Sequence, residues 1–153
     1  MPDDLYDRDF YTWTQQQARL LRAHAHQSDI PADWPHLIEE IEALGRDQIH
    51  AVQSNLIKAF SRIIAVAAWP SSRAVRGWKS EAMAALGSAQ RRYRPSMRHK
   101  IDDKIFLEAA ENAMLQDPID SLTSLPVTIS KVTLDDLLDP ARDVAALADR
   151  LRS

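Results

Sequence analysis

Apolar side chains recur at three- and four-residue steps along most of the chain, a spacing that predicts amphipathic α-helices. The first helix is predicted at about residues 9–26, and a break follows at 28–32. Its inward stripe consists of Phe10, Trp13, Gln17, Leu20, Leu21 and His24. A second helix of about 35 residues is predicted at 35–69, with Asp33 as its N-cap and Pro70 ending it.

Two further long helices are predicted after Pro70. The serines at 71–72 can cap a third helix that ends near Tyr93, and Ser96 can cap a fourth that ends near Gln116. Inside the second helix, Gly45 marks a place where the helix could bend, because glycine costs about 1 kcal/mol relative to alanine there.

The C-terminal part shows weaker signals. Residues 125–129 alternate briefly and are predicted to be extended, and Thr133 can cap a single turn that holds Leu137 and Leu138. The Asp-Pro pair at 139–140 is predicted to open a last helix, whose inward residues are Val144, Leu147 and Leu151.

Composition agrees with a helical chain. Only 3 glycines stand beside 8 prolines, whereas strand-rich domains usually need glycine in tight turns. A length of 153 residues with 45% hydrophobic content suffices for one packed core. We therefore predict an all-α, single-domain bundle of four main helices at about 8–117, with an irregular segment and a short C-terminal helical appendage at about 118–153.

Several classes of function are excluded by residue content. The chain has no cysteine, which removes disulfides, thiolate metal sites and cysteine nucleophiles. Its net charge is only -3, so no general attraction to polyanions follows. The first residues are acidic, and the longest apolar run, 63–69, is far too short to span a membrane. We expect a cytoplasmic protein that does not associate with membranes.

Histidines are the residues that most invite a metal site, but their spacing does not favour one. Di-iron bundles carry a Glu-x-x-His turn on each of two helices, and here only Asp47 and His50 have a comparable spacing. His24 continues an apolar stripe near a helix C-terminus. We expect no metal and no cofactor, with His24, Asp47 and His50 as the least implausible ligands. Nucleophile-elbow and phosphate-loop motifs are also absent from the sequence, and no catalytic residues are assigned.

Charged and polar residues lie on one side of the second predicted helix. Glu39, Glu42, Arg46 and His50 fall on the face opposite its apolar stripe. This arrangement predicts a solvated or partner-facing polar face, with an ion pair between Glu42 and Arg46 at i,i+4.

Positive charge is concentrated at residues 73–100, which hold eight basic residues against one acid. Arg76, Lys79, Arg91 and Arg94 are the binding candidates of this segment. A basic helix between acidic neighbours is what internal electrostatic matching predicts, and a phosphate-binding face is the alternative. Because the middle of the helix is uncharged and its outer face lacks stacking aromatics, nucleic-acid binding is expected to be weak at most.

Four groups of residues together resemble a known bacterial family. They are Tyr-Asp-Arg-Asp-Phe-Tyr-Thr-Trp-Thr at 6–14, Leu-Ile-Glu-Glu-Ile-Glu-Ala-Leu-Gly-Arg at 37–46, Gly-Trp at 77–78 and Arg-Pro-Ser-Met at 94–97. Over about residues 5–140 the chain resembles domain of unknown function 29. The resemblance implies a compact helical bundle in the bacterial cytoplasm. It does not indicate any activity, because the family is named for having none assigned. The chain departs from the family pattern at Arg62 and Ala65, where the family tends to have a histidine and a lysine.

The resemblance also suggests roles for two kinds of residue. It implies that Trp13 and Trp78 are core anchors, and a buried indole N–H needs an acceptor, for which Glu39 or Glu42 is available. The recurrence of the glutamates implies that one of them turns inward or pairs with a basic helix.

Three functional hypotheses remain from the sequence. The first is a non-enzymatic protein-interaction or oligomerisation module, with a protein partner or a second copy of the chain. The alternative is a metal-dependent helical-bundle enzyme, and the second alternative is a weak nucleic-acid binder that uses the basic third helix.

Overall fold

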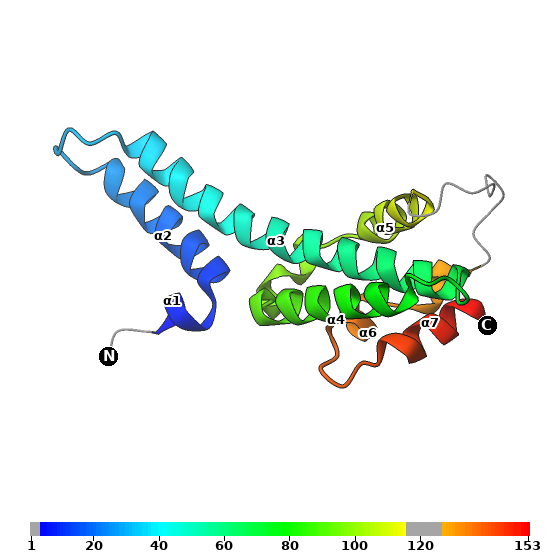
Figure 1. Ribbon diagram of the computed structural model, residues 1–153. Coiled ribbons are helices and arrows are strands. Elements are labelled where there is room, and N and C mark those ends of the chain that lie inside the picture. Colours follow the sequence, from blue (N-terminus) through cyan, green and yellow to red (C-terminus); the bar gives the residue numbers. More distant parts are fainter. Residues whose placement is uncertain (1–3, 116–126) are drawn as a thin grey trace. The chain divides into compact units, whose positions relative to one another are not determined.

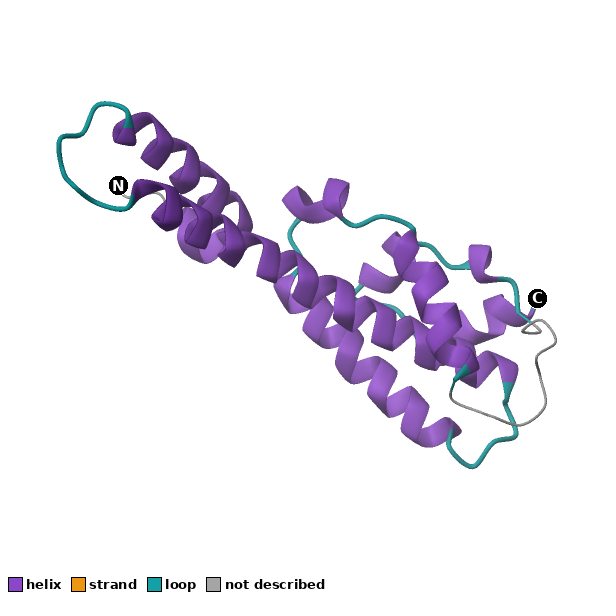
Figure 2. Ribbon diagram, turned by 90° about the horizontal axis from the view of Figure 1, so that it is seen from above, coloured by secondary structure: helices purple, strands orange, loops and turns teal. Residues whose placement is uncertain are grey.

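The computed structural model describes residues 4–115 and 127–153, and every regular element in these two ranges is helical (Figures 1 and 2). The α-helices are α1 (Leu5–Arg8), α2 (Phe10–Ala25), α3 (Trp34–Ala68), α4 (Val75–Arg92), α5 (Lys104–Met114), α6 (Leu134–Leu138) and α7 (Val144–Arg152). Two short 3-10 helices complete the list, η1 (Pro95–Lys100) and η2 (Ile129–Lys131). The predicted all-α fold is confirmed, and none of these helices is long and apolar enough to cross a membrane.

The first two long helices lie where the periodicity predicts them. The Asp9 carboxylate caps α2 by accepting the backbone N–H of Thr12 at 3.0 Å. Asp33 accepts the backbone N–H of His36 at 3.4 Å, and its other oxygen lies 2.6 Å from Nδ1 of that histidine. The hydrogen bond and charge of Asp33 raise the pKa of His36. The sequence did not predict the single turn α1 before α2.

The predicted fourth helix is wrong over its first part. Residues 95–100 form the 3-10 helix η1, the backbone of Ile101 is extended, and an α-helix begins only at Lys104. The Asp102 carboxylate accepts the backbone N–H of Lys104 at 3.0 Å, so this side chain starts a new helix. The predicted end near Gln116 lies outside the described residues, and the third helix begins at Val75, later than predicted.

The C-terminal prediction holds in part. Thr133 caps α6 in a capping box with Asp136, as its sequence position suggests. The last helix begins after Asp143, which accepts the backbone N–H of Ala145 at 2.9 Å, and not at 139–140. Of the predicted extended stretch 125–129, residues 125–126 lie outside the described residues, Thr128 is extended, and Ile129 already belongs to η2.

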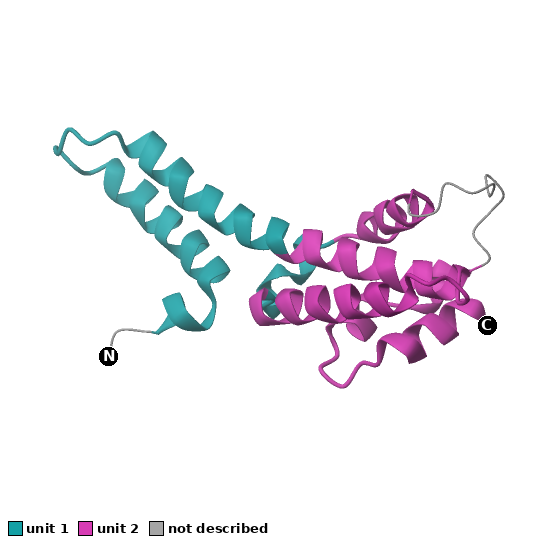
Figure 3. Cartoon of the chain, in the orientation of Figure 1, with its two compact units in different colours: residues 1–51, 93–101 teal, residues 52–92, 102–153 magenta. Residues whose placement is uncertain are grey.

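The chain divides into two compact units (Figure 3). Unit 1 comprises residues 1–51 and 93–101, and unit 2 comprises residues 52–92 and 102–153. The single-domain organisation stays a prediction.

Unit 2 is built around the second half of α3. Nearly every residue from Ala59 to Ala67 is buried, on all sides of the helix. The Phe60 and Phe106 rings meet edge to face at 5.1 Å, which joins α3 to α5, and the rings of Trp69 and Trp78 lie 6.3 Å apart. Helix α4 also packs against α6 and α7.

Unit 1 contains an antiparallel hairpin of α2 and the first half of α3. The two helices approach closely at Gly45, which is buried: a Cβ built there would lie less than 3.0 Å from the Thr14 hydroxyl oxygen. That hydroxyl is itself fixed, because Thr14 is fully buried and donates to the carbonyl of Tyr11 at 2.7 Å. The glycine therefore permits close packing of the two helices.

We expect Gly45→Ala to destabilise the protein by about 1 to 3 kcal/mol, because overpacking outweighs the gain in helix propensity. Gly77→Ala in α4 is the matched control, since a Cβ there meets nothing within 4 Å. We expect the control to be neutral or stabilising by up to about 1 kcal/mol. Urea unfolding of the two variants measures both changes, and equal effects would contradict the close approach.

Candidate functional site

One side of the α2–α3 hairpin carries two apolar stripes that face the same way. On α2 the stripe is Phe10, Trp13, Gln17, Leu20 and His24, and on α3 it is Trp34, Leu37, Ile41 and Leu44. Within each stripe the steps are three or four residues, so its members share one helix face. The rings of His24 and Trp34 meet edge to face at 5.4 Å, which places both stripes on the same side of the hairpin.

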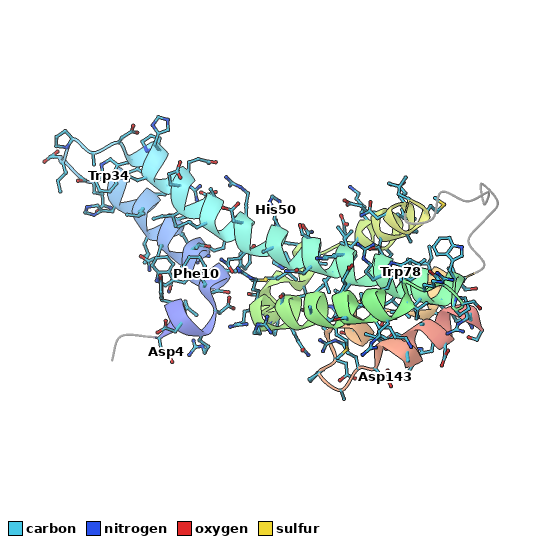
Figure 4. The ribbon with its side chains drawn as sticks, in the orientation of Figure 1. Asp4, Phe10, Trp34, His50, Trp78 and Asp143 are labelled. Carbon is cyan, nitrogen blue, oxygen red and sulfur yellow. The ribbon has the colours of Figure 1, made fainter. Side chains whose placement is uncertain are left out.

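We call this surface the apolar face and define it by Tyr6, Phe10, Trp13, Leu20, Leu37, Ile41 and Leu44. Tyr6 of α1 extends the stripe of α2, because its ring centroid lies 5.3 Å from that of Phe10 and 4.9 Å from that of Trp13. Phe10 and Trp34 are labelled at the beginnings of their helices in Figure 4, at opposite ends of the hairpin. None of the seven residues carries a charge.

The opposite side of the hairpin is charged. Glu42 is half-buried and pairs with Arg22 of α2, while Glu39 pairs with Arg46 at 2.6 Å. The predicted ion pair between Glu42 and Arg46 is therefore wrong, because Arg22 from the neighbouring helix takes Glu42. Among the described residues, neither Glu39 nor Glu42 accepts an indole N–H. The indole N–H of Trp34 donates instead to the backbone carbonyl of Ile30, at 3.3 Å.

Asp9 joins the start of α2 to η1. The Ser96 hydroxyl donates to the Asp9 carboxylate at 2.8 Å, and Arg94 donates to the carbonyl of Arg8 at 2.7 Å. Burial by itself raises the pKa of Asp9, but hydrogen bonds from Thr12 and Ser96, with the charge of Arg94, hold it below its ordinary value. Arg94 thus lies outside α4, and its guanidinium serves unit 1.

The other basic candidates lie on α4 and are exposed. They are Arg76, Lys79 and Arg91, the last of which donates to the Ser88 hydroxyl at 3.2 Å. Two acids of the C-terminal helices form ion pairs with arginines of α7, Asp136 with Arg150 at 3.1 Å and Asp149 with Arg152 at 2.7 Å. The internal electrostatic matching of α4 stays a prediction.

The two tryptophans assigned as anchors differ in burial. Trp78 is 8% exposed and lies on the buried side of α4 (Figure 4). Trp13 is half-buried and lies on the apolar face, with its ring stacked on Phe10 at 5.6 Å.

No metal centre is assembled in the described parts of the chain. His24, Asp47 and His50 are all exposed, and no three His, Asp or Glu side chains within residues 4–115 and 127–153 gather where they could hold an ion.

The periodicity of the sequence identified the stripe of α2 but predicted that it faces inward, and it gave α3 an apolar stripe without separating its covered from its exposed side. Leu20 is 57% exposed, Leu37 48% and Leu44 47%. The signal was present in the width of the pattern: each helix of the hairpin carries more apolar positions than one neighbouring helix can cover.

Comparison with known proteins gives a family and a fold. The family model described as "Domain of unknown function DUF29" matches residues 5–141. An α-helical protein of unknown function from Rhodospirillum rubrum, solved by crystallography, is 28% identical with a TM-score of 0.82. The match covers 97% of this chain and 98% of that protein. No curated protein matches the chain.

The Asp9 junction predicts a pH dependence of stability. A lowered native pKa means that the carboxylate stabilises the fold above the unfolded pKa of about 4, and that this contribution is lost as the pH falls through the native pKa. We expect Asp9→Asn, whose side-chain oxygen can still cap α2, to flatten the loss of unfolding free energy below about pH 4. Urea unfolding across the acidic range measures this. Asp29→Asn, at an exposed loop position, is the control and should leave the acid limb unchanged; identical curves for both variants would contradict the assignment.

Proposed function

Because the chain belongs to the DUF29 family, whose description names no activity, we propose from its surface chemistry that it is a non-enzymatic interaction module, in which the apolar face docks a second copy of the same hairpin. The exposure of the apolar face carries the proposal. Tyr6, Leu20, Leu37 and Leu44 are each about half exposed on one uncharged surface. Contiguous apolar surface of this kind marks protein contacts in soluble proteins.

The antiparallel arrangement of the hairpin supports a second copy as the occupant. Rotation of a second hairpin by 180° about an axis parallel to the helices would set its α3 over the first α2. Each helix would then have antiparallel neighbours, as in an up-and-down four-helix bundle. Because the apolar face carries no charge, no like charges would meet where the two copies contact each other.

The expected affinity is moderate. Covering the exposed half of a leucine or tyrosine gives about 1 kcal/mol, so the apolar faces of two copies give of the order of 10 kcal/mol together. Association costs about 4 kcal/mol or more, which leaves a dimer that dissociates at tens of micromolar.

A bacterial, cytoplasmic setting is part of the proposal. The chain has no cysteine and so cannot form the disulfides that are common in oxidising compartments, which supports a cytoplasmic setting.

Sedimentation equilibrium with a single charge on the apolar face tests the proposal. We expect the wild-type chain to dimerise at about 100 µM and Leu20→Glu or Leu44→Glu to be monomeric, because each would bury an unpaired carboxylate. Both leucines are about half exposed, so the helical circular dichroism and the midpoint of unfolding should change little.

Met83→Glu is the matched control, because Met83 is 51% exposed but lies on α4 in unit 2. We expect it to dimerise as the wild type does. A wild-type monomer at about 100 µM would overturn the second copy as occupant. If Met83→Glu also lost the dimer, the effect of a charge would not be specific to the apolar face, and the variants would no longer place the interface there.

A further inference from the structure

A groove of about 410 Å³ lies between α3 and α5 in unit 2. Its volume falls in the range of about 300 to 1,000 Å³ that small-molecule sites occupy. Charged side chains from both helices line it, Lys58 and Arg62 from α3 and Glu108 from α5, and Ile57 and Leu115 add apolar surface. All of these residues belong to one compact unit, so the groove does not depend on the placement of the other.

Arg62 has unused hydrogen-bonding capacity. Its side chain is 19% exposed, and its Nε donates to the Glu81 carboxylate of α4. Its Nη1 is buried and has no hydrogen-bond partner in the structure. A guanidinium has five N–H donors, and leaving a buried donor unpaired is unfavourable, more so for a charged group. Glu81 therefore fixes the position of Arg62 without saturating it.

Lys58 and Glu108 also have free charged ends. Both are exposed, and neither forms an ion pair with any residue of the described ranges. Lys58 lies one turn before Arg62, so the two cations share a face of α3. Glu108 brings a carboxylate to the same groove from the other helix.

The charge balance selects the class of ligand. Lys58 and Arg62 are offset by Glu108 and Glu81, so the groove with its ion-pair partner is formally neutral. A phosphate dianion would leave an excess of negative charge beside Glu108, whereas a ligand with one carboxylate and one ammonium keeps the site neutral. Carboxylate oxygens match the donors of Lys58 and Arg62, and an ammonium matches Glu108.

We propose that the groove between α3 and α5 binds a small zwitterion of the amino-acid class. Lys58 donates to its carboxylate, with the charge of Arg62 one turn away adding attraction, Glu108 accepts from its ammonium, and Ile57 and Leu115 contact an aliphatic side chain. This site is independent of the apolar face, which lies in the other unit.

Titration of the full chain with L-leucine, followed by amide chemical shifts, tests the proposal. We expect shifts at residues 54–62 and 108–115 with a dissociation constant of about 1 mM or tighter. The two half-ligands, isocaproate with the carboxylate alone and isoamylamine with the ammonium alone, should each bind at least about tenfold more weakly. Inorganic phosphate should bind more weakly than leucine.

Charge-removing variants locate the site. Glu108→Gln and Lys58→Met should each weaken leucine binding about tenfold, the factor that a lost charged hydrogen bond produces. Glu111→Gln is the matched control, because Glu111 is exposed on α5 but does not line the groove, and Lys79→Met plays the same part for Lys58. Both controls should bind as the wild type does, and the amide spectrum reports whether each variant is folded.

Three results would overturn the proposal. The first is the absence of shifts with leucine at about 10 mM. The second is tighter binding of phosphate than of leucine, which would assign an anion site instead. The third is an equal loss of affinity in Glu111→Gln and Glu108→Gln, which would remove Glu108 from the site.

Discussion

The structure depends on the burial of α3 from Ala59 to Ala67, where the helix is enclosed on nearly every side. A helix in this position cannot have a polar face, and any polar group on it needs a partner. The Ser61 hydroxyl donates to the carbonyl of Lys58 at 2.8 Å, and Arg62 pairs with Glu81. The Arg62–Glu81 ion pair links α4 to α3, and the Phe60–Phe106 ring pair links α5 to α3.

The first half of the same helix is in a different environment. There α2 covers one side of the helix, and Gly45 allows the Thr14 side chain to approach it closely. Ion pairs of Arg22 with Glu42 and of Arg46 with Glu39 occupy one side of the hairpin, and the apolar face occupies the other. A charged side with its pairs made and an apolar side left exposed is typical of a helical hairpin that packs against another protein surface.

The sequence predicted the long helices because their apolar periodicity agrees with their boundary residues, as at Asp33 before α3. It failed between Ser96 and Asp103, where the Ser96 hydroxyl bonds to Asp9 of a distant segment and the Asp102 carboxylate accepts the backbone N–H of Lys104, and these contacts cannot be read from apolar spacing. Periodicity also gave the wrong partner for Glu42, because the i,i+4 rule considers one helix and Arg22 comes from another. The width of the apolar pattern indicated that one neighbouring helix cannot cover both Leu20 and the buried side of α2, but periodicity alone does not show which of the apolar positions stay exposed. Arg62 was noted only as a departure from the family pattern; its link to Glu81 and to the groove depends on tertiary packing.

Thiol labelling of single-cysteine variants tests the central claim most directly, because the natural chain contains no cysteine. Leu44→Cys places a thiol on the apolar face, and Arg46→Cys places one on the charged side of the same helix. If the apolar face pairs with a second copy, labelling of Leu44→Cys slows as the protein concentration rises from about 1 to 100 µM, while labelling of Arg46→Cys stays constant. Rates that are independent of concentration at both positions would contradict the account.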